Sequence, residues 1–117
     1  MQYMILIYEP EGCYDGDGGQ AALQDIVARH MALAGELRAA GIQQEGAGLQ
    51  GVETATTVVT GAGGKQTIHD GPFAETREHL GGYYVIDVPD LDAALAMARR
   101  VPVMEGGKVE VRPLIVH

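Results

Sequence analysis

The sequence of 117 residues has no Trp, one Phe and a single cysteine, Cys13. One cysteine excludes an internal disulfide, so a secreted disulfide scaffold is not expected. With so few aromatic rings, the core must be mainly aliphatic. No apolar run approaches the ~20 residues of a membrane span, and residues 1–8 lack the basic start of a signal peptide. We therefore expect one cytoplasmic domain over residues 1–117.

Basic residues are also scarce. Eight Lys and Arg stand against sixteen Asp and Glu, which gives a formal net charge of −8. Such a surface repels phosphate backbones and anionic lipid headgroups. We expect the protein to bind neither nucleic acid nor a membrane surface.

Two helices are predicted from apolar residues at helical spacing. The first covers residues 20–40, and Gly41 supplies a left-handed cap after its last turn. The second is capped at its start by Asp90 and ends before Pro102. Their predicted buried stripes are Leu23, Ile26, Val27, His30, Ala34 and Leu37 in the first, and Leu91, Ala94, Leu95, Ala98 and Val101 in the second.

Extended segments separate and flank these helices. Residues 54–60 and 65–70 are joined by four small residues and read as a hairpin. Residues 71–80 are predicted to be a loop or a single helical turn. The remaining strands are predicted at 3–8, 43–49, 82–88 and 108–116.

The resulting order is β-α-β-β-α-β, with room for an extra short strand. It predicts an α+β domain with a ferredoxin-like antiparallel sheet and both helices on one face. The segments 3–8 and 83–88 are apolar on both faces, so the second face of the sheet also needs a cover. A second copy of the chain would supply one, and we expect a homodimer.

A long motif runs from Thr67 to Tyr84 and contains Asp70-Gly71-Pro72-Phe73. It closely resembles the signature of the DGPF subgroup of the YCII-related family, approximately T-D-G-P-F-A-E-T-K-E-x-L-G-G-[YF]. The likeness extends to residues 3–4, 36–41, 86–94 and 106–113, so it covers nearly the whole chain. His69 departs from the pattern, which has Thr or another small or apolar residue there.

The resemblance implies a dimeric α/β barrel built from ferredoxin-like domains. It also implies a His/Asp pair in a cleft, which maps onto His30 and Asp70, and a frequent association with sigma factors of the extracytoplasmic-function type. Because few members have an established activity, the resemblance gives a scaffold rather than a reaction.

Asp70 follows a predicted strand and precedes Gly71-Pro72, a combination that makes a rigid turn. Its carboxylate could bond the turn's own backbone or be held at the mouth of a cleft. His30 lies on an apolar helix stripe, where a histidine is either a satisfied core residue or the lining of a pocket. If the two side chains meet, His30 could act as a general base or acid with Asp70 fixing its tautomer.

Three more residues of the motif are candidates for substrate binding. Arg77 could clamp an anionic substrate, although a solvated charge is the alternative. Glu75 could take part in substrate binding beside Arg77, or it could pair with His79 on a helical turn. Gly81, followed by Gly82, lets the backbone approach either a ligand or a neighbouring chain.

Other patterns do not predict a cofactor or a metal. Residues 46–51 match G-x-G-x-x-G, but a strand-like segment follows them instead of a helix. Residues 15–18 lack the further ligands of a calcium loop. His69, Glu75 and His79 lack the spacing of a metal site, and no activating base is evident beside Cys13.

Two functions therefore remain open. One is an enzyme that needs no cofactor and uses His30 and Asp70 for acid–base chemistry on a small molecule. The other is a ligand-binding or regulatory module without catalytic activity, working with an extracytoplasmic-function sigma factor.

Overall fold

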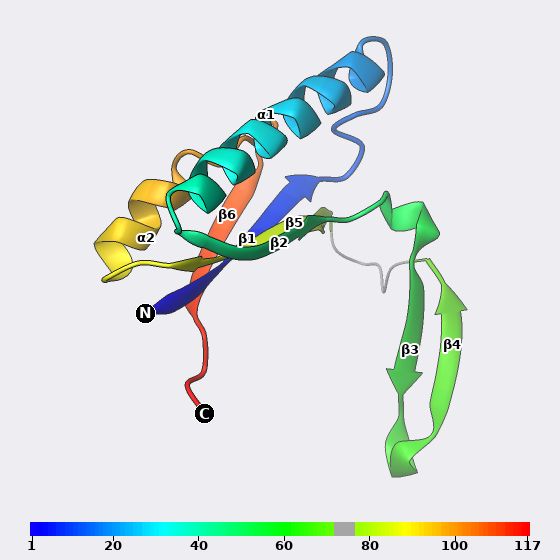
Figure 1. Ribbon diagram of the computed structural model, residues 1–117. Helices are drawn as coiled ribbons and strands as arrows, with labels where there is room; N and C mark the ends of the chain where they lie inside the picture. Colours follow the sequence, from blue (N-terminus) through cyan, green and yellow to red (C-terminus); the bar gives the residue numbers. More distant parts are fainter. Residues whose placement is uncertain (72–76) are drawn as a thin grey trace.

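A four-stranded antiparallel sheet forms the body of the protein. The computed structural model describes residues 1–71 and 77–117, and the strand order is β2-β5-β1-β6. Along the chain the body consists of β1 (Gln2–Pro10), α1 (Gly19–Ala39), β2 (Gln43–Gly48), β5 (Glu78–Asp87), α2 (Leu91–Ala98) and β6 (Lys108–Pro113). Both helices cover the same face of the sheet (Figure 1). This arrangement is compatible with the expected ferredoxin-like fold.

Alternation along β1 gives the sheet its two faces. Tyr3, Ile5 and Ile7 are at most 4% exposed and lie under the helices. The residues between them are only partly buried and face the other side, since successive side chains of a strand point in opposite directions. The same alternation in β5 places Tyr84 and Ile86 under the helices.

Each helix contributes a short set of buried residues to this core. Leu33 and Leu37 of α1 and Ala94 and Ala98 of α2 pack against the strands. The small side chains of α2 let that helix approach the sheet closely. The sequence prediction was wrong for the large residues beside them, because 47% of Val27, 50% of Leu91 and 39% of Leu95 is exposed.

The predicted helix ends are confirmed where a local signal defines them. Gly41 has φ 75°, the left-handed conformation expected after α1. The backbone N–H of Ala93 donates to Asp90 Oδ1 at 2.9 Å, which caps α2. None of the helices in the described ranges is both long and apolar enough to cross a bilayer.

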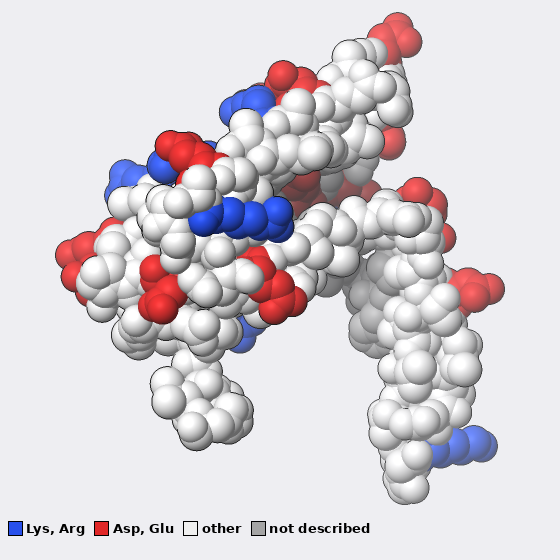
Figure 2. All heavy atoms as spheres, in the orientation of Figure 1, with Lys and Arg blue, Asp and Glu red and all other residues white. Residues whose placement is uncertain are grey.

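A hairpin projects from the body between β2 and β5. β3 (Thr56–Thr60) and β4 (Gln66–Asp70) pair only with each other, in a separate two-stranded sheet that we call the arm. Figure 1 shows the arm extending away from the helices. Every residue of β4 is exposed, and Figure 2 shows few charged groups on the arm, where Lys65 and Asp70 are the charged residues.

The arm corrects two expectations from the sequence. Its strands were predicted as part of one sheet, but exposed and partly buried residues alternate along β3 without a core to face. The segment before the last motif strand was predicted as a loop or helical turn. Instead β5 begins at Glu78, so His79 and Leu80 lie in a strand.

Because the body has a buried core and the arm does not, the same Ile→Ala substitution should lower the free energy of unfolding by different amounts in the two parts. Ile86→Ala removes a side chain that is 0% exposed, and we expect it to lower the free energy of unfolding by about 2 to 5 kcal/mol. At a protein concentration low enough to keep the chains separate, Ile68→Ala acts on a residue that is 72% exposed and should cost less than about 0.5 kcal/mol. Urea unfolding followed by circular dichroism measures both. Equal losses would contradict the assignment of the core.

Candidate functional site

His30 lies on α1 and is held by a tyrosine from the sheet beneath it. The Nδ1 atom of His30 is 2.6 Å from the hydroxyl oxygen of Tyr84 on β5. The two rings meet edge to face, with centroids 5.9 Å apart and planes at 87°. Tyr84 is 5% exposed and His30 is half-buried. The hydrogen bond therefore fixes the imidazole at the boundary between core and solvent.

A carboxylate from β1 acts on the same histidine. Glu9 accepts hydrogen bonds from the Tyr14 hydroxyl to both of its oxygens, at 2.8 and 2.7 Å. It also accepts one from the backbone N–H of Met104 at 3.0 Å. These bonds hold the Glu9 carboxylate in place, and its charge favours protonated His30. We call Glu9, Tyr14, His30 and Tyr84 the His30 cluster.

Burial dominates the electrostatics of His30. Desolvation lowers the pKa of His30 below its ordinary value, since a charged imidazolium is poorly solvated there. The Glu9 carboxylate and a hydrogen bond to the Pro102 backbone oppose this shift, and Arg29 adds to it. His30 is therefore neutral at pH 7, with groups nearby that stabilise its charged form.

The tyrosines of the cluster stay protonated. Burial raises the pKa of Tyr84, and burial together with the hydrogen bond to Glu9 raises that of Tyr14. The hydroxyl of Tyr84 can donate to Nδ1 or accept from it, depending on the imidazole tautomer. The arrangement can thus hold His30 both as a neutral ring and as an imidazolium.

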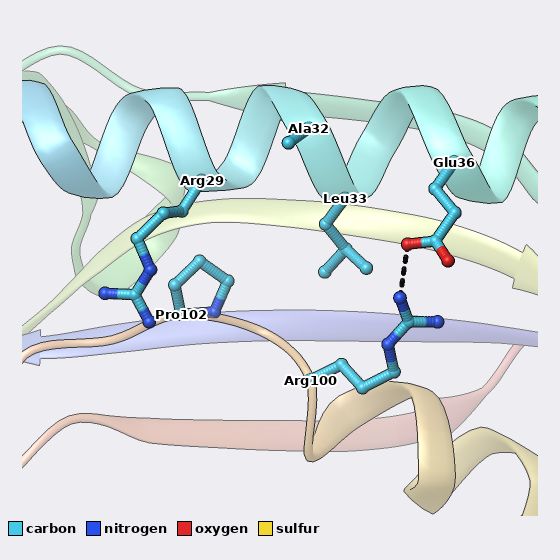
Figure 3. Close-up of a pocket in the computed structure, with 6 residues that line it drawn as sticks. All are labelled: Arg29, Ala32, Leu33, Glu36, Arg100 and Pro102. Carbon is cyan, nitrogen blue, oxygen red and sulfur yellow. Dashed lines mark hydrogen bonds and ion pairs between the residues drawn. The ribbon is translucent and has the colours of Figure 1, made fainter.

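A groove lies beside the cluster, between α1 and the chain that follows α2. It has a volume of about 260 Å³ and is lined by Arg29, Ala32, Leu33, Glu36, Arg100 and Pro102 (Figure 3). Arg100 forms an ion pair with Glu36 across the groove. Arg29 is also paired, with Asp25 at 3.6 Å, and both ion pairs are exposed, so a small anion would bind here by exchanging with the two carboxylates.

The structure does not bring Asp70 to His30. Asp70 is the last residue of β4, is exposed, and stands opposite Thr56 in the arm. The interactions of His30 in the described ranges are with Tyr84, Glu9, Pro102 and Arg29. Within one chain, the carboxylate that acts on His30 is therefore Glu9.

Of the other predicted binding residues, Gly81 lies beside the His30 cluster, because a Cβ atom on it would stand 3.7 Å from Glu9 Oε1. Glu75 lies outside the described residues. Arg77 is exposed, and its backbone oxygen accepts from the N–H of Glu11 at 2.6 Å. Gly81 lies where the register of β5 against β1 shifts, and its oxygen accepts from the N–H of Leu49.

Close packing explains the neighbouring glycine. A Cβ atom on Gly82 would stand 2.8 Å from the backbone oxygen of Ala47 on β2. The missing side chain of Gly82 therefore allows β5 and β2 to meet.

Glu9, Tyr14 and Tyr84 were missed as candidates from the sequence. Glu9 continues the alternation of Tyr3, Ile5 and Ile7, so the strand period alone places it on the helix face. Tyr84 ends the long motif. Successive side chains of its strand point to opposite faces, so the strand period also places Tyr84 on one face and Val85 on the other. Tyr14 comes from a loop, and no periodicity points to it.

Comparison with known proteins identifies relatives without an assigned activity. The family model of the YCII-related domain matches residues 1–116. An uncharacterized protein of Rhizobium meliloti (strain 1021) is 42% identical over 66 residues. The aligned part is 55% of this chain and 53% of the relative, so it spans about half the length of that protein. The comparison supports kinship and leaves the chemistry to be argued from the site.

The lowered pKa of His30 predicts how stability depends on pH. The unfolded chain binds the His30 proton more tightly than the folded protein does, so unfolding gains protons below about pH 6.5. The contribution to stability should be complete above that pH and should decline as the pH falls through the folded pKa. We expect His30→Gln to flatten this decline in urea unfolding between about pH 5 and pH 8.

The exposed His69 gives a matched control, because its imidazole contacts only the Thr67 hydroxyl within the described ranges. His69→Gln should keep the wild-type profile. A profile unchanged in His30→Gln would show that another group controls the acid dependence.

Proposed function

Since the chain belongs to the YCII-related domain family, we propose that it binds a small molecule beside α1 and exchanges a proton with it through His30. The observation that carries this proposal is the contact of 2.6 Å between His30 Nδ1 and the Tyr84 hydroxyl. That contact orients a neutral imidazole, and an oriented base within hydrogen-bond reach of its substrate is suited to proton transfer.

The proton transfer follows from the tautomer in which Nδ1 donates to the Tyr84 oxygen. Nε2 then carries a lone pair and takes a proton from the bound molecule. The resulting imidazolium is stabilised by the fixed carboxylate of Glu9 and by the Pro102 backbone. Returning that proton to another atom of the same molecule completes an isomerisation or an elimination.

The groove beside His30 supports a small anionic substrate. Arg29 and Pro102 line it, and these two residues also interact with His30. Arg29 and Arg100 would bind a carboxylate or phosphate group of the substrate. In this proposal they take the role that the sequence suggested for Arg77.

A second copy of the chain is the partner we propose. Met4 and Leu6 lie on the sheet face opposite the helices and are only partly buried. In addition, 57% of Val58 and 72% of Ile68 on the arm is exposed, and an isolated two-stranded hairpin has little stability in water. Pairing two copies through their open sheet faces, with the arms alongside, would cover both surfaces symmetrically.

The acid–base role is tested by following the His30 imidazole in NMR titrations. Glu9→Gln removes a charge that raises the pKa of His30, so the titration should move to lower pH. Asp70→Asn is the matched control, and we expect it to leave the titration unchanged. A larger effect of Asp70→Asn than of Glu9→Gln would restore the His/Asp pair and contradict this assignment.

Inorganic phosphate serves as the probe of the groove in the same spectra. It should shift the signals of Arg29, Arg100 and His30, and Arg100→Ala should weaken its binding. Lys65→Ala removes an exposed charge from the arm and should have no effect. Binding that both variants leave unchanged would place the anion elsewhere.

The proposed dimer predicts a different response from two exposed apolar sites. Ile68→Glu on the arm should weaken self-association at least tenfold in sedimentation velocity, because it places a charge in the interface. Val27→Glu on α1, where 47% of the native residue is exposed, should not. A monomer at all concentrations would contradict the dimer. If that monomer bound an extracytoplasmic-function sigma factor through the arm, the regulatory alternative would be favoured.

A further inference from the structure

A second pocket lies at the base of the arm. It is formed by residues 49–52, 54 and 55, from the segment that leads from β2 to β3, together with the start of β5 and Tyr8 of β1. Its volume is about 480 Å³, which is within the range of roughly 300 to 1,000 Å³ common for small-molecule sites. It shares no lining residue with the groove beside His30.

The lining of this pocket selects against anions. Tyr8, Leu49, Val52 and Leu80 provide apolar surface. Glu78 is the acidic residue of the lining and forms an ion pair with Lys108. Among residues 1–71 and 77–117, no Lys or Arg lines the pocket. An anionic ligand would therefore meet no opposite charge, whereas a neutral apolar molecule would bury its surface favourably.

One polar group in the pocket has no partner in the described part of the chain. His79 contributes to the lining, and its Nε2 atom is buried without a hydrogen bond. A buried nitrogen without a partner costs free energy that a hydrogen bond recovers. Since Nε2 is covered in the structure, a ligand in the pocket reaches it only after the imidazole rotates about its Cβ–Cγ bond, a torsion with a broad preference.

We propose that this pocket binds a neutral, mainly apolar small molecule whose single hydroxyl or carbonyl group bonds to Nε2 of His79. The apolar body of the ligand packs against Tyr8, Leu49 and Val52. The ligand thereby touches both the sheet and the segment that carries the arm. The site is separate from the His30 cluster, and the proposal does not depend on proton transfer there.

The test uses 2-naphthol as the probe, with naphthalene as the analogue that lacks the hydroxyl. In amide NMR spectra of the full chain, 2-naphthol should shift the signals of residues 49–55 and 78–80 and the imidazole nitrogens of His79. It should bind about tenfold more tightly than naphthalene, the difference expected for one buried hydrogen bond. His79→Phe should remove this preference while leaving naphthalene binding intact.

Two controls keep the result interpretable. His69→Phe changes an exposed histidine of the arm and should leave both affinities unchanged. Val52→Trp should block the pocket and abolish binding of both probes, which also tests the site if His79→Phe fails to fold. Equal binding of the two probes to the wild type, or shifts confined to other residues, would overturn the proposal. So would the absence of any shift, as expected if a second copy filled the pocket.

Discussion

β1 lies between β5 and β6, and both faces of the protein follow from the alternation of its side chains. Tyr3, Ile5 and Ile7 face the helices, with β5 and β6 adding to the same surface through their register. A slip of one residue would turn this apolar set toward the other face and place Glu9 away from His30. The core and the His30 cluster thus depend on one constraint. Burial of the first residues of β1 fixes the register of this strand against β5 and β6. That register in turn places Glu9, near the end of β1, on the face that carries His30.

The sequence predicts those parts of the fold that have a local cause. Gly41 and Asp90 mark helix ends because the left-handed cap and the side-chain cap each involve only neighbouring residues. The arm strands were also predicted, since β-branched residues (Thr and Val before, Thr and Ile after) flank a turn of small residues. Their separation from the main sheet was not predicted, because strand pairing depends on contacts between residues distant in sequence.

The same distinction explains the candidate site. His30 was identified because it lies on an apolar helix stripe and the family resemblance implies a His/Asp pair, and the structure places it at the edge of the core. Its partners come from β1 and β5, at sequence separations that no local pattern encodes. Asp70 was favoured because its motif is prominent and resembles a family signature. A prominent motif, however, shows that a residue type is needed there and does not show which side chain it meets.

Charge shows why the two proposed sites can select different ligands on one acidic protein. The net charge of −8 repels anions at long range, but ions screen this effect beyond about 8 Å at physiological salt. Inside a groove, the nearest charged groups therefore determine which ligand charge is favoured. Arg29 and Arg100 beside α1 are held in exposed ion pairs with Asp25 and Glu36, which a bound anion can exchange for contacts of its own, whereas no Lys or Arg of the described residues lines the pocket at the base of the arm. The first site can hold an anion despite the overall charge, and the second gains most from an uncharged molecule, because apolar burial is the main favourable term available to it.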